Sequence, residues 1–229
     1  MNYQELFDQI QAYTENQFPA TYLANGSTVS YTTQINTFIQ QAEERIYNTV
    51  QLPSLRKNVT GNCSSTTVYL GCPNDYLSTY SMAVIGSDGA YTYLLNKDVN
   101  FIRESYPEPT ATGLPRYYAL FGSRLNDPNE LAFMLGPKPD ANYGVELHYF
   151  YYPDSIVTAG TSWLGDNYSP ALLYGSLVEA YTYMKGEPDL LAMYNTKYQE
   201  AMQQLNRLGT GLERGDAYRD GQAKIKVNP

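Results

Sequence analysis

The sequence has few of the residues that metal, redox and hydrolytic chemistry require. Its 229 residues include two cysteines, Cys63 and Cys72, and one histidine, His148. A structural zinc site takes four Cys or His ligands, so this inventory excludes one. A Ser-His-Asp or Cys-His mechanism would have to use His148, which lies inside a β-type run where a packed or surface role is the commoner interpretation. No phosphate-binding glycine loop, calcium loop or G-x-S-x-G motif is present. We therefore predict no enzyme activity, no metal and no cofactor.

Basic side chains and long apolar runs are also scarce. The 15 Lys and Arg residues face 23 Asp and Glu residues, which gives a net charge of −8. Because nucleic-acid phosphates are held by Lys and Arg, sequence-specific binding to DNA or RNA is disfavoured. An acidic surface can still line a DNA passage, because it repels the DNA phosphates and so does not bind them. No apolar run approaches the ~20 residues of a membrane span, and residues 1–6 lack the pattern of a signal peptide. We expect synthesis in the cytosol.

Tyrosine, in contrast, is abundant, with 24 residues. Its apolar ring and polar tip suit surfaces that are half-buried against a partner, and tyrosine is equally common on exposed strand faces. For Cys63 and Cys72 we favour two partly buried thiols, and a local disulfide is the alternative.

The two ends of the chain have helical periodicity. Asn2 and Glu5 predict a capping box for a first helix, with Leu6, Ile10 and Tyr13 on one face. A second helix is expected to start at Thr32 or Thr33 and to stop at Pro53. Its apolar stripe comprises Ile35, Phe38, Ile39, Ala42, Ile46 and Val50, and we expect Glu43 and Glu44 on its solvated side.

Residues 169–208 predict two further helices. Ser169 is the expected cap of the first, with Pro170 at its first helical position. Pro188 is expected to start the second, and Gly209 to end it. The two apolar stripes comprise Leu172, Leu173, Leu177, Ala180, Tyr181 and Met184, then Leu190, Leu191, Tyr194, Tyr198, Ala201, Met202 and Leu205.

Between the helical ends, residues 56–158 consist of short β-type runs separated by turn residues. Ser87-Asp88-Gly89 is a hairpin turn signal. Because the connections look too short for helical crossovers, we expect antiparallel pairing. The runs cover residues 66–70, 80–85, 91–95, 116–121, 130–135 and 145–152.

The predicted fold is therefore α+β. N- and C-terminal helix pairs form a four-helix bundle from residues 1–55 and 159–208, with an inserted antiparallel β lobe at 56–158. Residues 209–229 form an extended C-terminal tail that we expect to be flexible in isolation. The tail is mildly basic and suits an acidic partner surface.

The whole layout resembles the bacteriophage head-to-tail connector or adaptor family of the tail-tubular or gatekeeper type. The resemblance rests on four stretches in the expected order. They are INTFIQQAEERIYNTVQLPSLR at 35–56, GLPRYYAL at 113–120, GPKPD at 136–140 leading to ELHYFYYP at 146–153, and the Leu-Leu-Tyr-x-x-Leu-x-x-Ala-Tyr helix with Met-Lys-Gly-Glu-Pro-Asp within 172–198.

This resemblance implies a structural virion protein at the head-tail junction, made in the host cytoplasm. Such a protein forms a homo-oligomeric ring, typically of twelve copies, between the portal protein and the tail nozzle or tail tube. DNA passes through the ring without sequence-specific binding. The resemblance also implies that the tail of the chain embraces the portal. The portal-binding residues expected here are Arg214, Tyr218, Arg219, Lys224, Ile225, Lys226 and Val227.

Two other functions compete with this interpretation. The tyrosines and the β region would also suit a carbohydrate-binding or receptor-binding tail protein, although helix pairs at both ends are unlike a simple lectin sandwich. A hydrolase is the third alternative, and it would need carboxylates that converge across a cleft.

Overall fold

The computed structural model describes residues 1–22, 28–122 and 131–212. The chain divides into two compact units, and each is described by itself. The helical unit comprises Met1–Ser54 and Pro153–Pro229, and the β unit comprises Leu55–Tyr152. A 3-10 turn, η1 (Pro53–Leu55), spans the first boundary.

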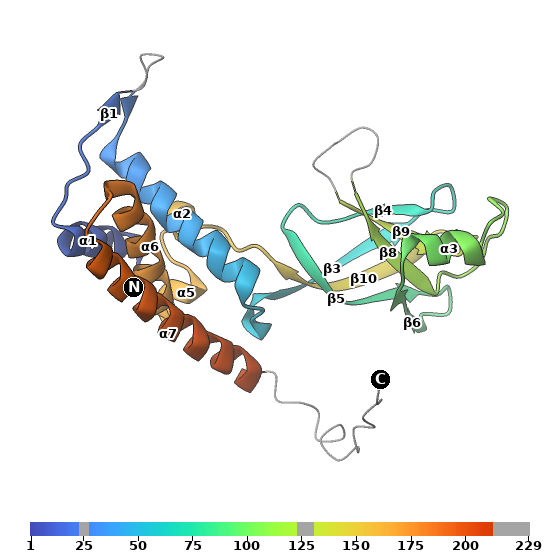
Figure 1. Ribbon diagram of the computed structural model, residues 1–229. Coiled ribbons are helices and arrows are strands. Elements are labelled where there is room, and N and C mark those ends of the chain that lie inside the picture. Colours follow the sequence, from blue (N-terminus) through green and yellow to red (C-terminus); the bar gives the residue numbers. More distant parts are fainter. Residues whose placement is uncertain (23–27, 123–130, 213–229) are drawn as a thin grey trace, which may run out of the picture. The chain divides into compact units, whose positions relative to one another are not determined.

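Six α-helices and a two-stranded ribbon make up the described part of the helical unit (Figure 1). The ribbon pairs β1 (Thr21–Tyr22) with β2 (Thr28–Val29). The helices are α1 (Tyr3–Thr14), α2 (Tyr31–Thr49), α4 (Ile156–Ala159), α5 (Trp163–Asn167), α6 (Ser169–Met184) and α7 (Pro188–Leu212).

Helix α6 is the centre of this unit, because it packs against α1, α2, α5 and α7. Its buried residues lie on more than one face, as expected for a helix surrounded by others. Gly175 marks the closest approach, since a Cβ there would lie 3.1 Å from the Cβ of Ala42 on α2 and 3.2 Å from the ring of Tyr198 on α7. Arg45 on α2 also pairs with Glu179 on α6.

The expected four-helix bundle is therefore wrong. Helices α4 and α5, which the sequence analysis did not predict, join the four long helices, and the unit is organised around α6. The N- and C-terminal helices do share one interior, because α2 packs on α6. The α+β class is confirmed.

Helix boundaries follow the predicted signals in part. The Asn2–Glu5 capping box is present, and every residue of the Ile35–Val50 stripe is buried. The cap of α2 is Ser30, two residues before Thr32, the earlier of the two expected positions. Helix α6 already includes Ser169 and has no side-chain cap. Helix α7 continues past Gly209, which is buried where α7 meets Leu52.

The β unit contains two four-stranded sheets (Figure 1). The first sheet has the order β3-β10-β5-β6, with β3 (Arg56–Cys63), β10 (Tyr143–Tyr151), β5 (Tyr76–Ile85) and β6 (Tyr91–Tyr93). The second has the order β4-β9-β8-β7, with β4 (Tyr69–Gly71), β9 (Ala132–Gly136), β8 (Tyr117–Phe121) and β7 (Leu95–Asn96). Helix α3 (Val99–Ser105) lies between β7 and β8 in sequence.

One hydrophobic core joins the inner faces of the two sheets. Phe133 of the second sheet is fully buried, and its ring centroid lies 5.5 Å from that of Tyr76 in the first sheet. Met82, Val84 and Leu147 belong to the same core. Sheets that pack face to face in this way form a sandwich. A second, smaller cluster around Ile102 attaches α3 to β8 and β9.

The expectation that the β lobe is antiparallel throughout is also wrong. Strands β7 and β8 pair in parallel, with Leu95 opposite Tyr117. A parallel pair needs a crossover connection, and α3 supplies the helix in this one, which the sequence analysis judged too short. The predicted hairpin at residues 87–89 is present between β5 and β6, and Gly89 adopts a φ of 78° there.

Candidate interaction surfaces

A groove lies between α2 and α6 on the helical unit. Its volume is about 420 Å³. Its aromatic wall is made by Phe38 and by Tyr183, whose side chain is exposed and whose ring centroid lies 5.3 Å from that of Phe38. The carboxylate of Glu179 is already paired with Arg45. An aromatic wall with a polar rim suits a side chain from a partner protein. The lining residues are Val29, Gln34, Thr37, Phe38, Gln41, Glu179, Thr182 and Tyr183.

Glu43 is a buried carboxylate, and its expected place on the solvated side of α2 is wrong. Its exposed fraction is 3%. Oε1 accepts a hydrogen bond from the backbone N–H of Ile156 at 2.9 Å, which ties α2 to the start of α4. Oε2 is buried and has no hydrogen-bond partner among the described residues. Burial raises the pKa of Glu43, although the hydrogen bond from Ile156 and the nearby Ser155 side chain oppose this rise.

The outer face of the first sheet carries His148 in a polar row. Ser81 Oγ lies 3.3 Å from His148 Nδ1, and His148 Nε2 lies 3.9 Å from Glu146 Oε1. Asn58 Nδ2 donates to the same Glu146 oxygen at 2.8 Å. The residue types match a Ser-His-acid set, but 3.9 Å is too long for the hydrogen bond by which the acid orients the imidazole. The row is better suited to hydrogen bonding with a partner surface.

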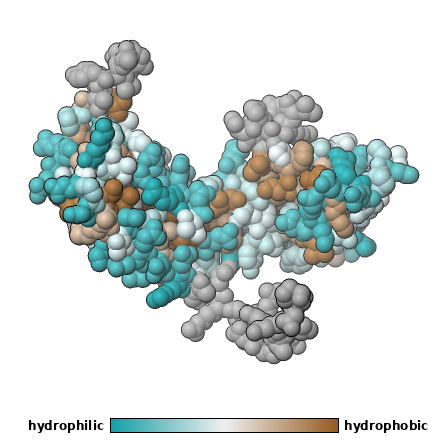
Figure 2. All heavy atoms as spheres, in the orientation of Figure 1, coloured by the Kyte–Doolittle hydropathy of each residue, from teal (hydrophilic) through white to brown (hydrophobic). Residues whose placement is uncertain are grey.

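Aromatic side chains on β5 and β6 are exposed. Tyr80, Tyr91 and Tyr93 have exposed fractions of 57%, 53% and 65%. The guanidinium of Arg56 lies 4.0 Å from the ring centroid of Tyr80 and 4.9 Å from that of Phe150. Exposed tyrosines beside hydrogen-bonding groups are common in protein interfaces. On the visible face of each unit, hydrophobic residues emerge in patches among hydrophilic ones (Figure 2).

Asp75 joins β3 to β10 through a charged network. It accepts hydrogen bonds from Lys57 Nζ at 2.7 Å and from the Tyr149 hydroxyl at 2.8 Å. Burial alone would raise the pKa of Asp75, but the hydrogen bonds and the Lys57 charge outweigh it and hold this pKa below its usual value. Burial and the hydrogen bond to Asp75 raise the pKa of Tyr149 to about 12. This network stabilises the strand ends.

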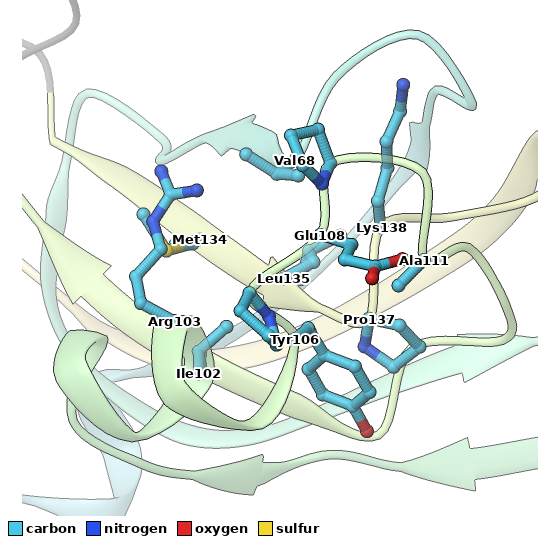
Figure 3. Close-up of a pocket in the computed structure, with 13 residues that line it drawn as sticks. Val68, Ile102, Arg103, Tyr106, Glu108, Ala111, Met134, Leu135, Pro137 and Lys138 are labelled. Atoms are coloured by element: carbon cyan, nitrogen blue, oxygen red, sulfur yellow. The ribbon is translucent and has the colours of Figure 1, made fainter.

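A small pocket lies beside α3 in the β unit (Figure 3). Ile102 and Tyr106 form part of its lining, and the side chain of Lys138 points away from it. Its volume of about 50 Å³ holds little more than a water molecule. The pocket is therefore too small for a substrate.

The structure also bears on metal binding and on the two thiols. In residues 1–22, 28–122 and 131–212, no three His, Cys, Asp or Glu side chains are grouped so as to hold a metal ion. Cys63 and Cys72 are both buried thiols, as favoured. Burial is the main cause that raises the pKa of the Cys63 thiol. Within the same residues, no helix is both long enough and apolar enough to cross a membrane.

The predicted portal-binding residues lie outside the described residues. They are Arg214, Tyr218, Arg219, Lys224, Ile225, Lys226 and Val227. The surfaces that sequence reasoning missed are the α2–α6 groove and the edge of β3. Glu43 was missed as well, although its position four residues after Ile39 and three before Ile46 places it on the buried side of α2.

Comparison with known proteins identifies the family of the chain. A family model matches residues 1–223, which is nearly the whole chain. The family is one of phage head-to-tail adaptors, so the chain is a structural component of the virion. Its description is SU10 adaptor protein, and the chain belongs to this family. The predicted resemblance is thereby confirmed. None of the curated proteins compared with the chain matches it.

Proposed function

We propose that this adaptor assembles into a closed ring of twelve copies that joins the portal protein to the tail nozzle or tail tube. DNA leaves the head through the channel that the ring lines. The observation that carries the proposal is the family match over residues 1–223. A ring of identical subunits requires head-to-tail contacts, in which two different surfaces of the chain meet.

The structure supports this proposal with two surfaces of different chemistry. The α2–α6 groove has an aromatic wall, and the outer face of the first sheet carries exposed tyrosines. A net charge of −8 would keep DNA from adhering to the channel wall. On this proposal the protein acts by assembly and does not turn over a substrate.

Electron microscopy and native mass spectrometry of the adaptor mixed with its portal protein test the ring. We expect a ring of twelve copies on the portal. Tyr183→Ala in the groove and Tyr93→Ala on the sheet face should each reduce ring formation, whereas Met193→Ala, which removes an exposed residue of α7, should not. An adaptor that binds the portal as separate single copies would contradict the proposal.

The C-terminal tail is proposed to bind the portal through the seven residues from Arg214 to Val227 named above. The truncation that tests this should begin at residue 213, because a truncation at residue 209 would also remove buried Gly209 and shorten α7. We expect portal binding to weaken and to become less sensitive to salt, since the tail contributes Lys and Arg side chains. Unchanged portal affinity after the truncation would contradict this part of the proposal.

A receptor- or carbohydrate-binding role would use the exposed tyrosines of the β unit. Tyr80, Tyr91 and Tyr93 lie on neighbouring strands, and aromatic faces of this kind stack on sugars. A glycan array would reveal binding that disappears in Tyr91→Ala and Tyr93→Ala variants. Binding by wild type alone would favour this second function over the ring.

A further inference from the structure

Strand β3 forms an open edge of the first sheet. It pairs with β10 over its whole length, from Cys63 opposite Tyr143 to Arg56 opposite Phe150, and no described strand lies on its other side. Residues Asn58 to Asn62 are all exposed. With eight residues, β3 is much longer than the other edge strands, which have two or three. An edge of this length presents a row of backbone N–H and C=O groups to an incoming strand.

An apolar groove runs beside this edge. Its volume is about 260 Å³, and its lining includes Phe133, Val145 and Leu147. Val59 pairs with Leu147 and so faces the inner side of the sheet, yet 39% of it is exposed. A Cβ placed on Gly61 would contact nothing within 4 Å. The groove therefore has room for the side chains of one more strand.

The chain itself contains a segment that fits such an edge. From Ala223 to Asn228, apolar and polar residues alternate, with Ala223, Ile225 and Val227 on one side. In a strand, this period of two places the three apolar side chains on one face and Lys224, Lys226 and Asn228 on the other. The ten residues between α7 and Ala223 can span roughly 33 Å when extended.

Charge favours the same orientation. With the apolar side in the groove, the two lysines would lie on the outer face of the sheet, which carries Glu146 opposite Thr60. The side chain of Glu146 is partly buried and its Oε1 is held by Asn58. On this otherwise acidic protein, the two lysines would thus share the outer face with a fixed carboxylate on β10, the strand on the far side of β3.

We propose that residues 223–228 bind along the open edge of β3 as an additional strand, with Ile225 and Val227 in the groove. Recognition of this kind combines backbone hydrogen bonds with pockets for alternate side chains. The pairing stands independently of the ring and of portal binding. If the tail also binds the portal, portal and β3 compete for it.

Hydrogen–deuterium exchange of the full chain and of a chain that ends at Gly221 tests the pairing. We expect amides of residues 57–62 to exchange about tenfold faster in the shortened chain, a factor that corresponds to roughly 1.4 kcal/mol of local stability. Amides of β5, which lies between β10 and β6, are the internal control and should not change. Equal exchange of β3 in the two chains, or an equal rise in β5, would overturn the proposal.

A matched pair of full-length variants separates the groove contact from a general effect of charge. Ile225→Asp places a carboxylate in the groove and should reproduce the fast exchange of the shortened chain. Asn228→Asp adds the same charge on the polar side and should leave β3 protected. If the two variants exchange alike, the proposed orientation fails. If the protection of the β3 amides persists on dilution, residues 223–228 come from the same copy of the chain. If that protection is lost on dilution, they come from a neighbouring copy. Either result supports the pairing.

Discussion

The helical unit and the β unit protect their interiors in different ways. In the helical unit the most buried helix, α6, is surrounded by α1, α2, α5 and α7. In the β unit, the inner faces of two sheets cover each other, but β3 remains an open edge with a groove beside it. A surrounded helix has satisfied its own backbone groups, whereas an edge strand has not. The comparison indicates that the β unit keeps more bonding capacity for assembly.

Truncation of core side chains should give the largest loss of unfolding free energy, and it tests whether the two units unfold separately. Leu177 on α6 and Phe133 on β9 are both fully buried. Leu177→Ala should lower the unfolding free energy by about 2–5 kcal/mol and Phe133→Ala by about 3–5 kcal/mol. Chemical denaturation followed by hydrogen exchange should locate each loss in the unit that carries the substitution. Loss of protection in both units with either variant would show that they do not unfold separately.

Overpacking at Gly175 tests the close helix approach that distinguishes the helical unit. Because Ala42 and Tyr198 already lie near the position of its missing Cβ, Gly175→Val should force α2 or α7 outward. We expect a loss of up to about 3 kcal/mol in thermal or chemical unfolding. Gly61→Val is the control, since a Cβ at Gly61 has free space. A variant at Gly175 as stable as wild type would mean that the helices move apart without cost.

Glu43 is a buried carboxylate of the helical unit, so its protonation links the stability of that unit to pH. Glu43→Ala leaves the N–H of Ile156 without its acceptor and should cost about 2 kcal/mol. Glu43→Gln keeps an acceptor oxygen and removes the charge. Since the folded pKa is raised, the stability at this site is present below the unfolded pKa of about 4.3 and is lost as pH rises through the folded pKa.

Denaturation of Glu43→Gln between about pH 4 and about pH 8 should therefore show an advantage over wild type that grows with pH. The exposed neighbour provides the control, because Glu44→Gln should show no such growth. A constant difference between Glu43→Gln and wild type across this range would contradict the raised pKa.

Asp75 gives the smallest expected effect, with the opposite dependence on pH. Its folded pKa is lowered, so its stabilisation is present above the unfolded pKa of about 3.9 and is lost as pH falls through the folded pKa. Asp75→Asn should destabilise the β unit by less than about 1 kcal/mol at neutral pH, because its partner Lys57 is solvent-exposed. The difference from wild type should shrink in acid-unfolding curves below about pH 4. A difference that grows in acid would be incompatible with the Lys57–Asp75 pair.

The sequence was most informative where apolar spacing is local. The Asn2 capping box and the Ile35–Val50 stripe are found as predicted because each depends on residues within a few turns of one helix. Burial of Glu43 depends on α4, which is distant in sequence. The polar character of Glu43 alone therefore led to the wrong prediction that it is exposed.

Strand pairing was harder to predict than helix position. Strand β3 contains little besides polar residues and glycine, so its sequence lacks the alternation of a half-buried strand. The parallel pairing of β7 with β8 depends on the short helix α3, whose pattern is too brief to detect. The outer-face row around His148 results from the register of three strands, which no single segment encodes.

The β unit enters and leaves the chain through strands that are partners. Arg56, at the start of β3, lies opposite Phe150, near the end of β10. A module whose two ends are adjacent can be exchanged as a cassette, because a short linker closes the gap that it leaves. We therefore expect that residues 55–152 can be replaced by another sheet module with adjacent ends while the helical framework of this chain stays the same.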